Sequence, residues 1–181
     1  MGDTVELVAV PPGEVLRALV AADPVPPSVP LPDETRQAWP ELASKVAQAL
    51  RQGGGQLVAE YAHYVAGVVR AVGYDFGTLE HTPSGDDEFR RRFLSIPAVA
   101  RYGRNAVANL FNRALGGLSW YEYPMLGHLT VEEVMAANEH IGDDPPPDDP
   151  EHPSDQGELL VLDAALTRSA QFGLELHAIY G

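Results

Sequence analysis

The longest helix-like hydrophobic pattern in the chain covers residues 56–72. Its apolar residues recur at intervals of three and four, the spacing that places side chains on one face of an α-helix. They are Leu57, Tyr61, Val65, Val68, Val69 and Val72. The opposite face is only weakly polar, with Glu60, His63 and Arg70. The pattern therefore predicts a central helix that is buried over most of its surface.

Strand-like patterns lie near the two ends of the sequence. Residues 5–10 form a short valine-rich run that stops at Pro11, and proline cannot donate to a strand ladder. Residues 174–180 alternate between apolar and polar positions after Gly173. A strand needs a pairing partner, so we expect these two segments to pair with each other. The result is a mostly helical α+β protein with a small sheet that pairs the N- and C-terminal strands.

Shorter patterns predict the remaining elements. Helices are expected at 13–22, 33–52, 86–95, 97–115, 131–141 and 158–172. Asp33 is a suitable N-cap, and Pro40 leaves two alternatives open, a second helix or a kink in one helix. Loops are expected as a helix-to-helix turn at 53–55, a polar turn over 76–87 and an irregular aromatic stretch over 118–129 that closes the core. In the last helix the residues expected to face inward are Leu159, Leu162, Leu166 and Phe172.

Two proline-rich segments interrupt these patterns. Residues 23–33 contain five prolines, and residues 143–156 contain five prolines and six acidic residues. Such segments have few backbone donors and few apolar side chains to bury, so both are predicted to be linkers or loops, the second one mobile. Both lie too close to the ends to separate two full domains. We therefore expect a single domain over residues 1–181.

Composition excludes several kinds of chemistry. The chain has 181 residues, 45% of them hydrophobic, which is enough to build a core without disulfides or metals. It has no cysteine, so thiolate nucleophiles and cysteine-based zinc sites are absent. A net charge of −14 disfavours binding to nucleic acid. No apolar run approaches the ~20 residues of a membrane span, and the start lacks signal-peptide features, so we expect a cytoplasmic protein with no membrane contact.

The positive charge is concentrated in one segment. Six of the twelve basic residues lie within 90–113, no acidic residue lies within 89–121, and the rest of the chain carries −20 once these six charges are removed from −14. One interpretation is a site for a small anion or a partner on one side of the helix. The other is internal pairing with Asp86, Asp87, Glu88 and the acidic segment 143–158. The candidate site residues are Arg101, Arg104, Asn105, Asn109, Asn112 and Arg113.

Motifs for catalysis, cofactors and metals are not found. No serine lies in a G-x-S-x-G elbow, and the triple glycine at 53–55 lacks the Gly-Lys-Ser/Thr ending of a phosphate loop. The nearest approach to metal-ligand spacing is Glu132 and Glu133 with His140, which are two helical turns apart. The sequence therefore predicts no metal site and no cofactor, identifies no catalytic residue and favours a protein that is not an enzyme.

Residues 130–133 read Thr-Val-Glu-Glu, which is a capping box at a helix start. The surrounding sequence, Gly-His-Leu-Thr-Val-Glu-Glu-Val at 127–134, resembles a segment of bacterial proteins built on a domain of unknown function, loosely the YfbM-like group. The resemblance implies an N-terminal strand, an acidic linker after the box, an amphipathic helix and a final strand ending in an aromatic-Tyr pattern, here at 178–181. It implies no activity and no catalytic residues.

Two classes of function fit these observations. The first is a non-enzymatic protein-interaction role, such as an immunity or antitoxin-like protein whose partner has a basic surface. The second is a small enzyme or binding protein for a phosphate-bearing or other anionic small molecule that uses the arginine-rich helix. The acidic charge and the lack of a catalytic motif favour the first class, because an acidic surface attracts a basic partner.

Overall fold

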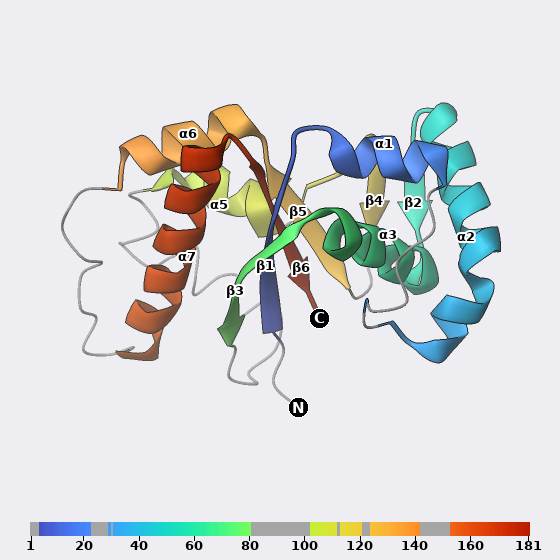
Figure 1. Cartoon of the computed structure of the whole chain (residues 1–181), viewed down its shortest axis with the longest axis horizontal. Coiled ribbons are helices and arrows are strands. Elements are labelled where there is room, and N and C mark those ends of the chain that lie inside the picture. Colours follow the sequence, from blue (N-terminus) through green and yellow to red (C-terminus); the bar gives the residue numbers. More distant parts are fainter. Residues whose placement is uncertain are drawn as a thin grey trace.

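The computed structural model describes residues 4–22, 29, 31–80, 102–111, 113–120, 124–141 and 153–181 (Figure 1). The fold is α+β, as predicted. The elements expected at 86–95, in most of 23–33 and at 142–152 lie outside the described residues. Among the described helices, none has the combination of length and hydrophobicity that crossing a lipid bilayer requires.

A four-stranded antiparallel sheet forms the centre of the fold. Its strands are β1 (Thr4–Val10), β3 (Tyr74–Glu80), β5 (Met125–Leu129) and β6 (Glu175–Tyr180), in the order β3-β1-β6-β5. The predicted pairing of the two terminal strands is confirmed: β1 and β6 pair from Val5 opposite Tyr180 to Val10 opposite Glu175. The two terminal strands therefore lie side by side in the interior of the sheet.

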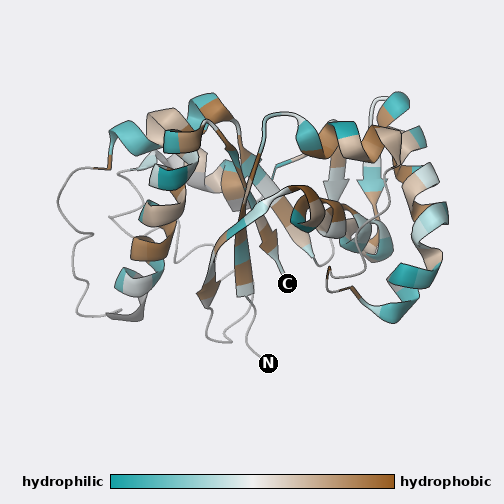
Figure 2. Ribbon diagram, in the orientation of Figure 1, coloured by the Kyte–Doolittle hydropathy of each residue, from teal (hydrophilic) through white to brown (hydrophobic). Residues whose placement is uncertain are grey.

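Helices cover both faces of this sheet (Figure 1). On one side lie α1 (Glu14–Ala21), α2 (Asp33–Arg51) and α3 (Ala59–Val72), and on the other lie α5 (Arg104–Phe111), α6 (Val131–Glu139) and α7 (Pro153–Phe172). Neighbouring residues of a strand point to opposite faces. Leu7 and Ala178 accordingly pack in the core beside α7, whereas Val8 and Ile179 pack in the core beside α3. Figure 2 shows the hydrophobic residues gathered along these strands.

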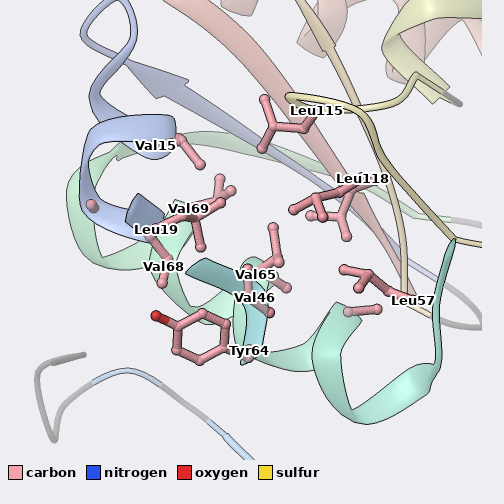
Figure 3. Close-up of a cluster of buried hydrophobic side chains, with 14 of the residues drawn as sticks. Val15, Leu19, Val46, Leu57, Tyr64, Val65, Val68, Val69, Leu115 and Leu118 are labelled. Atoms are coloured by element: carbon pink, nitrogen blue, oxygen red, sulfur yellow. The ribbon is translucent and has the colours of Figure 1, made fainter. Parts of the chain in front are cut away.

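The predicted buried helix is confirmed as α3, although it begins at Ala59 instead of residue 56. Its residues Val65, Val68 and Val69 are buried against α1 and α2, together with Tyr64 (Figure 3). Leu57, expected on the same helix, lies just before it in a short strand. The burial of so many side chains on one helix explains its weakly polar outer face.

A second, two-stranded sheet replaces the helix-to-helix turn predicted at 53–55. Strand β2 (Gly55–Leu57) pairs in parallel with β4 (Leu118–Trp120). The two backbones are in close contact just before these strands, because a Cβ atom added to Gly54 would lie 2.2 Å from the Gly117 carbonyl. Both glycines also have positive φ angles, 100° and 85°. The glycines therefore provide close backbone contact rather than a simple break between helices.

Besides β2, three further strands were not predicted. β3 replaces part of the polar turn expected at 76–87, where a register shift between Leu7 and Val8 of β1 and a φ of 133° at Gly77 disturb the alternation. β4 and β5 replace much of the irregular stretch at 118–129. The expectation that this stretch closes the core holds for Trp120, which is buried and donates from Nε1 to the Leu126 carbonyl at 2.7 Å.

Helix boundaries also differ from the predictions. α2 is one helix with Pro40 inside it, and Asp33 is its first residue, while Pro32 occupies the N-cap position without a side-chain cap. α5 is shorter than the predicted helix at 97–115, and α7 begins at Pro153 inside the predicted linker 143–156. Phe172 was expected to face inward but is 62% exposed, because it lies on the last turn of α7 beyond the core.

Candidate functional site

The structure describes only part of the arginine-rich candidate site. Arg101 and Asn112 lie outside the described residues. Arg104 and Asn105 form the first turn of α5, and their side chains also lie outside the description. The predicted cationic surface on one side of this helix therefore remains a prediction for these four residues.

The other two candidates, Asn109 and Arg113, come together on one carboxylate. Asn109 Nδ2 donates to Glu133 Oε1 at 3.1 Å, and Arg113 Nη1 donates to Glu133 Oε2. The same carboxylate accepts the backbone N–H of Thr130 at 2.9 Å, and Thr130 Oγ1 accepts the backbone N–H of Glu133 at 3.3 Å. The predicted capping box is confirmed, and Glu133 lies in neither of the acidic segments expected to pair with the arginines.

The electrostatics of this cluster favour a closed structural unit. Partial burial of Glu133 opposes ionisation, but hydrogen bonds from Thr130, Arg113 and Asn109 outweigh that effect and lower its pKa. The carboxylate is therefore ionised at neutral pH and balances the guanidinium of Arg113. A cation already paired in this way has less capacity to hold an external anion.

Two histidines form a second cluster next to it. His128 on β5 and His177 on β6 occupy directly opposite positions, and their rings stack with centroids 5.2 Å apart and planes 16° apart. His177 Nε2 lies 3.3 Å from Glu175 Oε2, and Glu175 Oε1 accepts the Gly13 backbone N–H at 3.3 Å. The cluster thus joins two strands of the sheet to the start of α1.

His128, one of the two stacked histidines, is uncharged at neutral pH. Burial, with smaller contributions from the neighbouring His177 and Arg113, lowers the pKa of His128 to about 4. No group of three or more metal-ligating side chains is present within the described ranges. The arrangement is that of a buried polar contact between strands, which the cross-strand register creates.

A surface groove between α2 and α3 offers a different kind of site. This α2–α3 groove has a volume of about 540 Å³. Its apolar lining includes Leu42, which is buried, and Val58, which is exposed. Three carboxylates, Glu34, Glu41 and Glu60, lie around it. The full lining is Pro32, Glu34, Ala38, Glu41, Leu42, Lys45, Val58, Ala59, Glu60, Tyr61 and His63.

The groove carries a net negative charge. Lys45 Nζ lies 2.5 Å from Glu41 Oε1, and this contact lowers the pKa of Glu41 and raises that of Lys45, to which Tyr61 also contributes. Burial, followed by the charge of Arg70, lowers the pKa of His63, so its imidazole is neutral at pH 7. Within the described part of the chain, Glu34 and Glu60 have no ion-pair partner.

The groove was not predicted from the sequence. One local signal was present, because Glu34, Glu41 and Lys45 are spaced by seven and four residues and therefore share a helix face. The hollow itself depends on how α2 packs against α3, where the rings of Trp39 and Tyr64 are tilted by 54° with their centroids 4.3 Å apart. That packing has no counterpart in local spacing. The histidine pair escaped prediction for a similar reason, because it depends on strand register.

No family model, curated protein or solved structure matches this chain. The assignment of function therefore depends on the residues and the geometry of the groove and of the neighbouring clusters.

Proposed function

We propose that the protein is a non-enzymatic protein-interaction module, comparable to an immunity or antitoxin-like protein, whose partner presents a basic surface. The α2–α3 groove is the observation that supports this most. It combines an apolar lining with two carboxylates, those of Glu34 and Glu60, that no described cation neutralises. We also propose, from the capping-box sequence at 127–134, a relationship to the YfbM-like group.

The charge of the whole chain supports the same kind of partner. A net charge of −14 attracts a basic protein and raises the rate of encounter, an effect that salt weakens. Once the two proteins are in contact, the groove supplies the short-range interactions. Apolar side chains of the partner would meet Leu42 and Val58, and its lysines or arginines would meet the carboxylates at the rim.

A basic amphipathic helix fits this chemistry best. Recognition of a helix in a groove uses apolar anchors at intervals of three and four residues, with the polar face left at the rim. The groove is bounded by two helices, and its lining combines apolar side chains with exposed carboxylates. A helix that carries lysines beside a leucine stripe therefore satisfies both parts of the surface.

The experiment uses an 18-residue amphipathic peptide with a leucine face and a lysine face as the probe. Its affinity is measured by isothermal titration for the wild type and for Glu34→Gln combined with Glu60→Gln. We expect the double variant to bind about three- to tenfold more weakly, as two exposed charge contacts are lost. The matched control is Glu132→Gln with Glu139→Gln, which removes the same charge from exposed positions on α6.

The control variant should change affinity by about twofold or less, since it alters only the long-range field. Chemical-shift changes on adding peptide should be centred on Leu42, Val58 and Tyr61. Equal weakening in the two double variants, or shifts centred elsewhere, would show that the groove is not the binding surface. An absence of peptide binding at low salt would overturn the proposal as well.

A further inference from the structure

A second cavity lies between the end of α7 and the beginning of β3. This α7–β3 cleft has a volume of about 720 Å³, a size typical of small-molecule sites. Tyr74 and Phe76 enter it from β3, and Arg168 and Phe172 enter it from α7. It shares no residue with the α2–α3 groove.

The aromatic rings of this cleft are unusually open to solvent. Tyr74 is 59% exposed and Phe172 is 62% exposed, although the described chain buries most of its large apolar side chains. Exposed aromatic rings in a hollow are available for stacking against a planar ligand. The cleft therefore differs from a gap in core packing, where the rings would be enclosed.

Arg168 supplies the hydrogen-bond donors of the cleft. Its guanidinium carbon lies 4.6 Å from the centre of the Phe76 ring, which holds the side chain in a fixed orientation at the wall. Within the described ranges, no carboxylate or carbonyl accepts a hydrogen bond from this guanidinium. Its planar set of N–H donors matches a carboxylate in a two-point contact.

Asp75 narrows the choice of ligand. It lines the same cleft, and its Oδ1 accepts the Gly77 backbone N–H at 2.9 Å. A negative charge in the wall disfavours a ligand with more than one negative charge. A singly charged carboxylate meets Arg168 with less repulsion than a doubly charged phosphate does.

We propose that the α7–β3 cleft binds a small aromatic carboxylate. The ring of the ligand stacks on Tyr74 and Phe172, and its carboxylate accepts hydrogen bonds from Arg168. This site is independent of the protein-binding groove, and the protein can have either one without the other.

The test compares indole-3-acetate with indole-3-acetamide, which has the same ring and similar shape but no charge. Binding is followed by NMR titration of the whole chain. We expect indole-3-acetate to bind at least about tenfold more tightly, the usual difference for a charge-assisted contact. Adenosine monophosphate, a phosphate-bearing ring, is expected to bind more weakly than indole-3-acetate.

Variants separate the two parts of the site. Arg168→Gln should abolish the preference for indole-3-acetate over the amide, whereas Phe172→Ala should weaken both probes alike. Leu160→Ala, at an exposed position on the same helix, is the matched control and should change neither. All three positions are exposed, so circular dichroism should show a folded protein in each case.

Several results would overturn the proposal. These are equal affinity for the acid and the amide in the wild type, a preference that survives Arg168→Gln, or no saturable binding of indole-3-acetate below about 10 mM. Tighter binding of adenosine monophosphate than of indole-3-acetate would show that the cleft prefers a phosphate to a carboxylate. It would also show that Asp75 does not disfavour doubly charged ligands.

Discussion

Arg113 donates to the same Oε2 atom of Glu133 that accepts the backbone N–H at the start of α6. One carboxylate therefore serves as a helix cap and as the counter-ion of an arginine that lies two residues after α5. This double role explains why the capping box could be recognised in the sequence while the arginine partner could not. The box is local, and the ion pair spans 20 residues.

Removing the cap hydroxyl should weaken α6. Thr130→Ala deletes the oxygen that accepts the Glu133 N–H, and the expected loss is about 1 kcal/mol of unfolding free energy. Denaturant titration measures it. Thr130→Ser keeps the hydroxyl and should lie close to the wild type. An alanine variant as stable as the wild type would mean that the cap contributes nothing.

Removing Arg113 should lower the stability of the protein, because the Glu133 carboxylate loses its counter-ion. Arg113→Ala leaves Glu133 without its cation, and we expect a loss of about 0.5–1 kcal/mol, because the pair is partly exposed. Thermal unfolding in sulfate and in chloride at equal ionic strength checks whether the arginine also holds an anion. The loss should be the same in both salts.

The same salts test the alternative of an anion site on the arginine-rich segment. That alternative requires sulfate to stabilise the wild type more than chloride, by mass action on the folded state. It also requires Arg101→Ala combined with Arg104→Ala to remove the difference. Sulfate also stabilises folded proteins in general, without a specific site. With Arg113 engaged by Glu133, we therefore expect the difference between the two salts to be the same in the wild type and in the double variant.

Stability should fall between pH 7.5 and pH 5.5 because of His128. Its pKa is about 4 in the folded protein, against 6.5 for an ordinary histidine, so the unfolded chain takes up the proton first. The contribution is fully present above pH 7 and is lost as the pH falls toward 4. We expect about 1 kcal/mol over this interval.

Denaturant titrations at the two pH values measure this loss, and His128→Asn should reduce it. Part of the slope should remain, because His63 also has a lowered pKa and titrates with the same sign. A wild-type slope equal to that of His128→Asn would contradict the burial assigned to this imidazole.

The close backbone contact next to the β2–β4 pair gives a direct comparison between two adjacent glycines. Gly53 and Gly54 have similar positive φ angles, 95° and 100°, but only at Gly54 would an added Cβ atom meet another backbone. Gly53→Ala should cost about 1 kcal/mol for the strained φ. Gly54→Ala adds a clash with Gly117 and should cost roughly 3 kcal/mol or more. Similar losses for both would show that the close contact can relax.

Those features that one segment determines by itself were predictable from the sequence. The periodicity of Val65, Val68 and Val69 placed α3, and the Thr130–Glu133 spacing placed the start of α6. The pairing of the terminal strands followed from having only two clear candidates. Features that need two segments were missed, such as β3, whose alternation is interrupted by Phe76, the extra residue between the partners of Leu7 and Val8.

In the candidate sites too, the features within one segment were predictable and the contacts between segments were not. The helical spacing of Glu34 and Glu41 was visible in the sequence, but the groove also needs Val58, the N-cap residue of α3, and Glu60 in its first turn. In the α7–β3 cleft, Arg168 and Phe172 are four residues apart on one helix, yet Tyr74 and Phe76 come from a strand nearly a hundred residues earlier. Only the folded arrangement brings such groups together.

The position of β1 inside the sheet has a consequence for how the chain reaches its native state. Hydrogen bonds join Thr4 and Gly181, 177 residues apart, so β1 lacks one of its two neighbours until the last strand has been synthesised. Contacts of such long range slow folding. During synthesis a valine-rich strand keeps an open edge, and such an edge is a site for pairing with other chains. This edge closes only when β6 pairs with β1.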